Sequence, residues 1–454
     1  MAKEKVPEGY KDESLEFFKK NNIKAWNEVQ ITKDSAKYRG IILPRNKFAK
    51  DGFIEIKLKN GYNIGIEITK DTEIEVLGKK PPMSVKFEGA KVATDKSKAD
   101  VTLIGTGGTI ASRLDYVTGG VIPAFEPNEL YAAVPELSEI CNLDTEVVFQ
   151  IFSEDMQPKH WTDLATKVAD LNNSGVDGIV IGHGTDTMGY STAALSFLVD
   201  NLKVPVVFVG SQRSSDRPSS DAALNLINAT NVAAHADLAE VVLCMLGTSS
   251  HTYGLIHRGT TVRKMHSSVR HTFRTIGDVP LGKIDNGDIQ WFKDDIKRKS
   301  SIDKNVETVA TDKIENKVGL VYIHPGISSD VIDNYIDKGY KGLVLAGTGL
   351  GHAPHSIFDS LERAAEEDIL MLMTVQTLWG YTGMDVYETG RELQQIGVLP
   401  GKNMLPETAF VKMCWALGNY PNLERAKEIM ITNIAGEIAD GEPENGYQVL
   451  QGIE

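Results

Sequence analysis

Residues 178–198 read GIVIGHGTDTMGYSTAALSFL, and this stretch predicts a strand, a short turn and a helix in that order. The run GIVIG is apolar on both faces of an extended chain, as are strands in the interior of a parallel sheet. Thr185, Asp186 and Thr187 lie in the turn, beyond the carboxyl end of the strand. In an α/β sheet these strand ends form the edge at which ligands bind. The stretch therefore predicts an α/β fold with polar groups at its ligand-binding edge.

The same rhythm of strand, loop and helix recurs along the chain from Val101 onward. Further apolar runs predict strands at VTLIGTGG, VPVVFVGS, EVVLCMLG, VGLVYIHPG, GLVLAGTGLG and ILMLMTVQT. Apolar strands that are separated by helices indicate a mostly parallel sheet covered on both faces. A charged stretch near residues 291–317 interrupts the pattern. We therefore expect a larger α/β domain over residues 101–300 and a smaller one over residues 316–454.

The first hundred residues follow a different pattern of short, alternating strands. The segment FIEIKLKNGYNIGIEI alternates apolar and polar positions on both sides of Asn60-Gly61, which predicts a hairpin with a two-residue type I′ turn. The stretch DESLEFFKKN predicts one short amphipathic helix within an otherwise polar N-terminal arm. We expect a small β-barrel-like module over residues 1–78 and a linker over residues 79–100, where Pro-Pro and lysines break the pattern.

The composition is that of a globular protein, and it limits which partners and which cellular compartment are expected. It has 454 residues and a formal charge of −14, which argues against broad, non-specific contact with nucleic acid. Cys141, Cys244 and Cys414 are far apart, which fits a reducing compartment and gives no disulfide framework or zinc site. The N-terminus has no apolar signal core, and no stretch approaches the roughly 20 apolar residues of a membrane span. The expected location is the cytoplasm.

The glycine-rich stretch IGTGGTIASRLDYVTGGV, residues 104–121, follows the first of the buried strands. It contains neither the G-x-G-x-x-G dinucleotide fingerprint nor a P-loop with its lysine. Three interpretations stand beside one another: a phosphate-binding loop, a structural turn, and a site loop that presents Thr109. In the last case Tyr116, on a loop with Gly119 and Gly120, would exchange a proton with Thr109; otherwise this tyrosine only packs on the surface.

Several polar groups also have purely structural interpretations. Asp186 or Thr187 alone would be a helix N-cap, and Lys264 alone a solvated charge. The segment SQRSSDRPSSDA, with Arg213 and Arg217, is interpreted as a helix-capping run with exposed arginines. Four histidines follow or adjoin loops, but no H-E-x-x-H pattern and no cysteine partners accompany them, so we expect no metal site. These histidines are His183, His324, His352 and His355.

Several separated motifs, taken in order, resemble the bacterial-type L-asparaginase family. The motifs are TGGTIAS, HGTDTMGYSTAALSFL, TTVRKMHSSVRHTF, LVLAGTGLGHAP and GRELQQIGVLPGKNMLPETAFVKMCWALG. The resemblance covers about residues 100–440. It implies a larger N-terminal α/β domain and a smaller C-terminal one, working as dimers or tetramers.

The resemblance also implies roles for particular side chains. Thr109 carries over as the attacking group, with Tyr116 as its proton acceptor in the substrate pocket. Thr185, Asp186 and Lys264 form a second trio in which a charged lysine positions Thr185 and stabilises negative charge. The resemblance does not decide whether Thr109 or Thr185 forms the acyl-enzyme. Ser153 and Glu154, in FSEDM, match the position that holds the α-amino and carboxylate groups of the substrate.

The β-rich extension makes the chain similar to the D-subunit family of archaeal glutamyl-tRNA(Gln) amidotransferases. This resemblance implies a glutaminase that releases ammonia from glutamine, with asparagine as an alternative substrate, within a carbon–nitrogen ligase. A partner E subunit would use ATP and Mg²⁺ to activate glutamyl-tRNA(Gln) and would hold most of the tRNA, while this chain would need no cofactor. The implied assembly is a heterotetramer that contains a homodimer of this chain.

Two other interpretations of function compete with this one. The chain would be a free L-asparaginase with an incidental N-terminal module, or a non-catalytic scaffold that holds a tRNA-binding partner. For the N-terminal module, partner docking is favoured over RNA contact because the chain is acidic overall.

Overall fold

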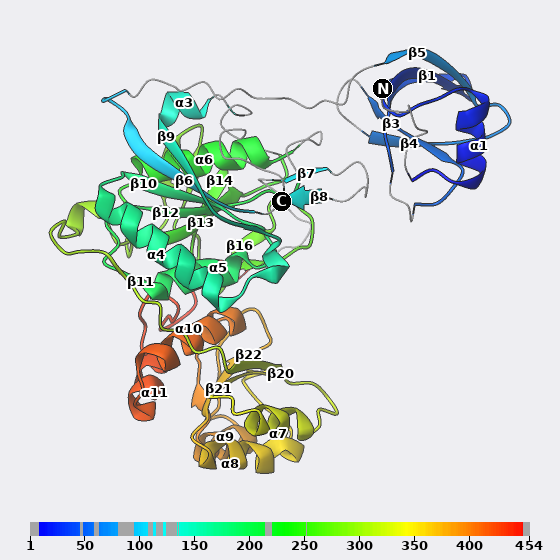
Figure 1. Cartoon of the computed structure of the whole chain (residues 1–454). Coiled ribbons are helices and arrows are strands. Elements are labelled where there is room, and N and C mark those ends of the chain that lie inside the picture. The colour runs from blue at the N-terminus through cyan, green and yellow to red at the C-terminus, as the bar shows by residue number, and fades with distance from the viewer. Residues whose placement is uncertain are drawn as a thin grey trace.

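The computed structural model has three parts that follow one another along the chain (Figure 1). They are a small antiparallel sheet with one helix, a large sheet covered by helices, and a small parallel sheet with its own helices. The structure describes residues 9–45, 49–58, 63–79, 95–107, 112–114, 121–123, 134, 136–213, 220–250 and 252–447.

The N-terminal part is an antiparallel sheet in the order β4-β3-β2-β1-β5, with α1 packed on it. The expected polar arm is wrong for its described portion, because Tyr10 and Phe18 are buried in the core of this module. The Tyr10 hydroxyl donates to the carbonyl of Leu43 at 2.9 Å, so the segment is part of the fold. The elements are α1 Asp12–Lys20, β1 Asn27–Lys33, β2 Ala36–Ile42, β3 Phe53–Leu58, β4 Asn63–Glu67 and β5 Glu73–Lys79.

The predicted hairpin between β3 and β4 is present, but its register does not match a two-residue turn. Lys57 pairs with Asn63, which leaves five residues between the paired positions. A two-residue turn at Asn60-Gly61 would require an even number of residues between partners. The turn itself lies outside the described residues, as do residues 80–94 of the expected linker.

The large sheet has the order β18-β17-β14-β13-β12-β10-β6-β9 in the described part of the chain. Neighbouring strands from β9 to β13 are parallel, as predicted. The other edge of the sheet is antiparallel, which the sequence patterns did not indicate, and consists of β13, β14, β17 and β18. The strands are β6 Ala99–Gly107, β9 Cys141–Ile151, β10 Gly178–Gly182, β12 Val206–Val209, β13 Val241–Leu246, β14 Gly254–Arg258, β17 Gly282–Asp285 and β18 Asp288–Trp291.

Helices cover both faces of this sheet (Figure 1), and alternate residues of β10 belong to different cores. Ile179 and Ile181 of β10 lie in one core with α4 and α5, whereas Val180 lies in a second core with α6. All three side chains are fully buried. This explains why the strand is apolar at every position. The helices are α3 Leu137–Ile140, α4 Pro158–Ser174, α5 Met188–Leu198 and α6 Ala222–His235.

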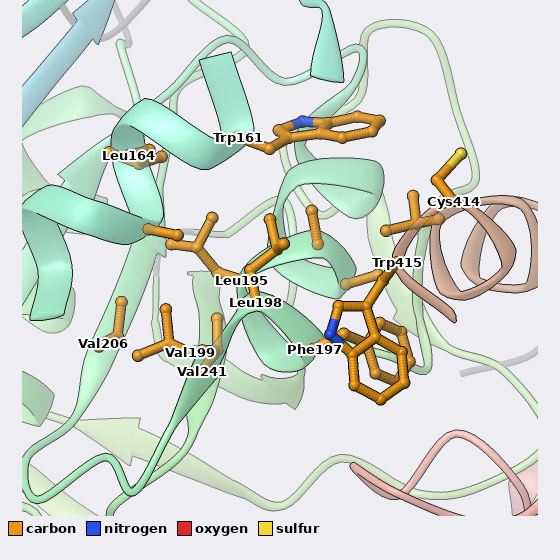
Figure 2. Close-up of a cluster of buried hydrophobic side chains, with 14 of the residues drawn as sticks. Trp161, Leu164, Leu195, Phe197, Leu198, Val199, Val206, Val241, Cys414 and Trp415 are labelled. Atoms are coloured by element: carbon orange, nitrogen blue, oxygen red, sulfur yellow. The ribbon is translucent and has the colours of Figure 1, made fainter. Parts of the chain in front are cut away.

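The C-terminal part is a parallel sheet in the order β20-β21-β22-β23, as its apolar runs predict. Helix α10 joins it to the large domain, because α10 packs against both α5 and β21. Figure 2 shows this junction, where Trp415 of α10 stacks on Phe197 of α5 with ring centroids 5.6 Å apart. The elements are β20 Val318–Tyr322, α7 Asp330–Asp337, β21 Gly342–Gly347, α8 Phe358–Glu366, β22 Leu370–Val375, α9 Glu388–Ile396, β23 Leu399–Pro400, α10 Pro406–Asn419 and α11 Leu423–Ile431.

Short elements complete the structure. Three two-stranded ladders pair β7 with β8, β11 with β19, and β15 with β16. Their bounds are β7 Ser112–Leu114, β8 Val121–Pro123, β11 Val199–Asp200, β15 Val262–Lys264, β16 Phe273–Thr275 and β19 Val309–Ala310. The single-turn 3₁₀ segments are η2 Ser153–Asp155, η3 Lys299–Ser301, η4 His355–Ile357 and η5 Glu444–Gly446. Among the described residues, no helix has the length and apolar character needed to cross a membrane.

Candidate active site

The turn between β10 and α5 carries Thr185 and Asp186 at the carboxyl edge of the sheet. Thr185 is buried, whereas the Asp186 side chain is 67% exposed. The neighbouring strand β12 approaches this turn closely. A Cβ atom at Gly210 would lie 2.8 Å from both the Thr185 methyl group and the carbonyl oxygen of His183, so only glycine fits there. The two strands therefore hold Thr185 in a crowded and well-defined position.

Lys264 contacts both Thr185 and Asp186 at this strand end. It is the last residue of β15, and its Nζ atom lies 2.8 Å from both Thr185 Oγ1 and Asp186 Oδ1. The ammonium group has no acceptor function, so it donates to both oxygens and leaves the Thr185 hydroxyl hydrogen available for another acceptor. The lysine side chain is only 14% exposed, which reduces screening of its charge by water. The trio implied by the resemblance is thus assembled in space.

Ser153 lies at the same edge. It begins η2, shortly after the end of β9, and its carbonyl accepts a hydrogen bond from the Thr187 hydroxyl at 2.8 Å. Ser153 is buried, at 4% exposure. Glu154, the next residue, is exposed. The structure therefore brings Ser153 to the turn that carries Thr185 and Asp186.

The first glycine-rich stretch starts from this edge as well. The Thr106 hydroxyl donates to the carbonyl of Gly182 at 2.8 Å, which ties the ends of β6 and β10 together. Gly107 has φ +106° and pairs with Ile151 of β9, two residues before Ser153. A Cβ atom there would lie 2.2 Å from the Ile151 carbonyl oxygen, so the position requires glycine. Thr109 and Tyr116 lie outside the described residues.

A pocket of about 370 Å³ adjoins the lysine. Its wall includes Asp186 and Tyr190 from the α5 region, Arg263 and Lys264 from β15, and Glu407 from α10. Arg263 and Glu407 form an ion pair with Nε 3.2 Å from Oε1. Burial, reinforced by Glu407, raises the pKa of Tyr190 to about 12, so this phenol keeps its proton at neutral pH. Tyr190, Arg263 and Glu407 were not predicted to lie at this pocket, because Tyr190 and Arg263 are far apart in the sequence of the large domain and Glu407 comes from α10 of the C-terminal part.

The four histidines considered for a metal site do not gather at one place. His183 is buried beside Thr185, and its Nδ1 lies 2.7 Å from the Gly184 carbonyl oxygen. His352 contacts the Thr389 hydroxyl at 3.1 Å, and His355 pairs with Glu392 at 2.9 Å, both in the C-terminal part. His324 contacts the Pro325 carbonyl. Within the described ranges, no three histidine, cysteine or acidic side chains are grouped so as to hold a metal ion.

The segment after β12 matches the predicted capping run only in part: the Ser220 hydroxyl accepts from the Ala222 N–H at 3.1 Å, whereas the Asp221 side chain makes no capping hydrogen bond to α6. Asp221 is fully buried at the N-cap position of α6. Its carboxylate accepts hydrogen bonds from the backbone N–H groups of Gln212 and Arg213 at 2.9–3.1 Å. Arg217 lies outside the described residues. The Asp221 carboxylate therefore holds the chain in place just after Gly210, the residue that lies close to Thr185.

Two buried histidines are expected to make stability depend on pH. Burial lowers the pKa of His183 to about 4 and that of His257 to about 3, whereas unfolding returns both to about 6.5. Between pH 6.5 and 4 the unfolded chain therefore binds protons that the folded chain does not, and stability falls as the pH falls. Each histidine contributes a slope of about 1.4 kcal/mol per pH unit.

This pH dependence can be measured by urea unfolding at several pH values from 4.5 to 7.5. His257→Leu should make the slope shallower by about one proton between pH 4.5 and 6. His235→Leu, at an exposed position, is the matched control and should leave the slope unchanged. Equal slopes in the wild-type protein and His257→Leu would contradict the prediction.

The fold and this site together define an α/β protein of the asparaginase type, and the comparisons with known proteins agree. The family described as Asparaginase, N-terminal, matches residues 100–297, and Glutaminase/Asparaginase C-terminal domain matches residues 317–430. The L-asparaginase of Thermococcus kodakarensis superposes with a TM-score of 0.67 at 28% identity, covering 75% of this chain and 99% of that chain. L-asparaginase I of Vibrio cholerae gives a TM-score of 0.65 at 29% identity over the same shares.

A third family, GatD N-terminal domain, matches residues 23–77 and accounts for the β-rich module. The D subunit of glutamyl-tRNA(Gln) amidotransferase from Pyrococcus abyssi is 51% identical over 429 residues, which are 93% of this chain and 97% of that protein. The protein of the same name from Methanopyrus kandleri is 42% identical over 98% of both chains. The chain belongs to the D-subunit family of glutamyl-tRNA(Gln) amidotransferases, which confirms the resemblance inferred from its motifs.

Proposed function

We propose that this chain is the glutaminase subunit of a tRNA-dependent amidotransferase. The observation that carries the proposal is the Lys264 ammonium group bonded to both Thr185 and Asp186 at a strand end of an asparaginase-type fold. The D-subunit relatives, matched along nearly their whole length, support glutamine as the substrate and an amidotransferase as the setting. The released ammonia passes to a partner subunit that converts glutamyl-tRNA(Gln) to glutaminyl-tRNA(Gln).

The proposed chemistry is a two-step amide hydrolysis through a threonine ester. A threonine Oγ, from Thr109 or Thr185, attacks the carboxamide carbon, and its hydroxyl proton passes to the leaving nitrogen, by way of Tyr116 when Thr109 attacks. The carbonyl π electrons move to oxygen and then return as the C–N bond breaks, and the leaving nitrogen takes a proton to become ammonia. Water then hydrolyses the ester to glutamate. Lys264 stabilises the negative charge that develops on oxygen, and Ser153 and Glu154 hold the α-amino and carboxylate ends.

The partner and its cofactors follow from the same proposal. The partner E subunit binds ATP and Mg²⁺ and holds most of the tRNA, and this chain contributes glutamine hydrolysis without a cofactor of its own. Two copies of this chain form a homodimer within a heterotetramer. The cytoplasm is the proposed compartment, supported by three buried free thiols at Cys141, Cys244 and Cys414.

The test is to co-purify the chain with its partner and to measure ammonia release from glutamine with and without glutamyl-tRNA(Gln). We expect release that rises when both partner and tRNA are present, with asparagine hydrolysed more slowly. Strong hydrolysis of free asparagine that ignores both additions would instead identify a free L-asparaginase.

Thr109→Ala separates a catalytic subunit from a scaffold. Because this change removes a hydroxyl proposed for the attack, ammonia release and glutamine-dependent amidation of tRNA should fall together. Amidation driven by added ammonium chloride should persist, since it bypasses this chain. Unchanged ammonia release in Thr109→Ala would contradict the catalytic role and favour a non-catalytic scaffold.

A further inference from the structure

His183 is a fully buried side chain that directly precedes the active-site turn, and the proposed chemistry gives it no role. Its backbone N–H donates to the Val209 carbonyl at 2.9 Å, which anchors it to β12. Its ring lies beside Phe208, with centroids 5.7 Å apart. The imidazole is therefore fixed in the interior, next to the residues that carry Thr185.

The surroundings of the ring identify its tautomer. Nδ1 lies 2.7 Å from the Gly184 carbonyl oxygen, and a carbonyl only accepts hydrogen bonds, so Nδ1 carries the hydrogen. Burial lowers the pKa of the ring to about 4, so the imidazole is neutral and Nε2 has no hydrogen. Among the described residues Nε2 is buried and has no partner, which agrees with this assignment.

The hydrogen bond to Gly184 sets the direction of the next peptide group. The carbonyl of Gly184 and the N–H of Thr185 belong to one planar trans peptide, so they point in opposite directions. Because the ring holds the carbonyl inward, the Thr185 N–H points away from the ring. In the described part of the chain no acceptor bonds to this N–H, although Thr185 is only 4% exposed. Glycine at position 184 would otherwise let this peptide rotate easily.

We propose that His183 is a positioning residue that aims the Thr185 N–H at the substrate carboxamide oxygen. The inference rests on the proposed glutaminase function. When a threonine Oγ forms its bond to the carboxamide carbon, the carbonyl π electrons become an oxyanion, and the Thr185 N–H donates a hydrogen bond to it. The electrons return to the C–O bond as the C–N bond breaks, so the N–H stabilises only the transient charge. A donor fixed in advance needs no reorganisation during the reaction.

The geometry also explains why a histidine suits this position. A neutral imidazole donates one hydrogen bond through Nδ1–H and places no charge in the interior. An asparagine amide nitrogen occupies nearly the same position relative to the backbone as Nδ1. Leucine fills a similar volume without any donor. Comparing histidine, asparagine and leucine at position 183 therefore distinguishes the effect of the hydrogen-bond donor from the effect of side-chain volume.

The experiment measures ammonia release by His183→Leu and His183→Asn in the full chain bound to its partner, with glutamyl-tRNA(Gln) present. In His183→Leu we expect kcat to fall about 10- to 100-fold while KM for glutamine and inhibition by glutamate stay within about twofold. His183→Asn should recover most of kcat. His257→Leu is the matched control, because His257 is also buried with a lowered pKa but bonds to Thr275; its kcat should not change.

Three results would overturn the role of His183. They are an unchanged kcat in His183→Leu, an equal loss in the leucine and asparagine variants, and an equal loss in His257→Leu. If His183→Leu does not fold, His183→Phe takes its place, since it keeps an aromatic ring and removes the donor. A wild-type complex that releases no ammonia from glutamine would instead refute the proposed function, so the two failures are distinguishable.

Discussion

Replacing Lys264 with methionine is expected to lower the kcat of glutamine hydrolysis by about a thousandfold while the chain stays folded. Methionine has a similar length but neither charge nor hydrogen-bond donors. The change removes both 2.8 Å contacts, to Thr185 Oγ1 and to Asp186 Oδ1. In a site where the lysine is only 14% exposed, water replaces that positive charge poorly. The loss should therefore appear in kcat, where developing negative charge matters, more than in KM.

The measurement is steady-state ammonia release, with thermal unfolding as the check on the fold. Lys293→Met is the matched control, because Lys293 is 18% exposed and paired with Asp278, a residue outside the site. Its kcat should equal that of the wild type. Lys264→Arg should recover little, since a planar guanidinium does not reproduce a compact ammonium between two oxygens. A Lys264→Met variant with more than a tenth of wild-type kcat would contradict the role given to this lysine.

The parallel half of the large sheet was predictable because its signal is local. Strand β10 is apolar at every position, and the α5 segment follows within a few residues. The antiparallel half was missed because its strands are short and partly polar. The pair β17 and β18 turns through Asn286-Gly287, with φ +50° and +90°, which fits a two-residue type I′ turn. The type I′ turn was instead predicted at the same dipeptide at positions 60–61, where the strand register does not match a two-residue turn.

Some site residues were likewise predictable from local sequence, whereas others depend on contacts between distant parts of the chain. Thr185 and Asp186 stand out because they follow a buried strand directly. Lys264, 79 residues further on, is joined to Thr185 only by the fold, and the sequence pointed to it through family resemblance alone. The direction of the Gly184–Thr185 peptide depends on the contact between His183 and a backbone carbonyl, and no sequence pattern specifies it.

The largest effect on stability is expected from Lys412→Met, at a fully buried ion pair between α10 and the C-terminal segment. Both side chains of the pair Lys412 and Glu437 are 0% exposed, and Nζ lies 2.5 Å from Oε1. The lysine also donates to the carbonyls of Met430 and Thr432, while the carboxylate accepts from the N–H groups of Ile434 and Ala435. Burial lowers the pKa of Lys412, and the nearby carboxylate opposes this shift. Removing the lysine alone leaves a buried carboxylate without its partner charge, which costs about 3–5 kcal/mol.

A double-mutant cycle separates the unpaired charge from the loss of packing. Glu437→Gln removes the negative charge and keeps an oxygen that accepts from the backbone N–H groups. If the unpaired charge dominates, the variant Lys412→Met with Glu437→Gln should be more stable to urea than Lys412→Met alone, by about 2 kcal/mol or more. Arg425→Met, which breaks the exposed pair between Arg425 and Glu428, is the control and should cost less than about 1 kcal/mol. Additive effects of the two changes would mean that this junction is stabilised by packing rather than by charge pairing.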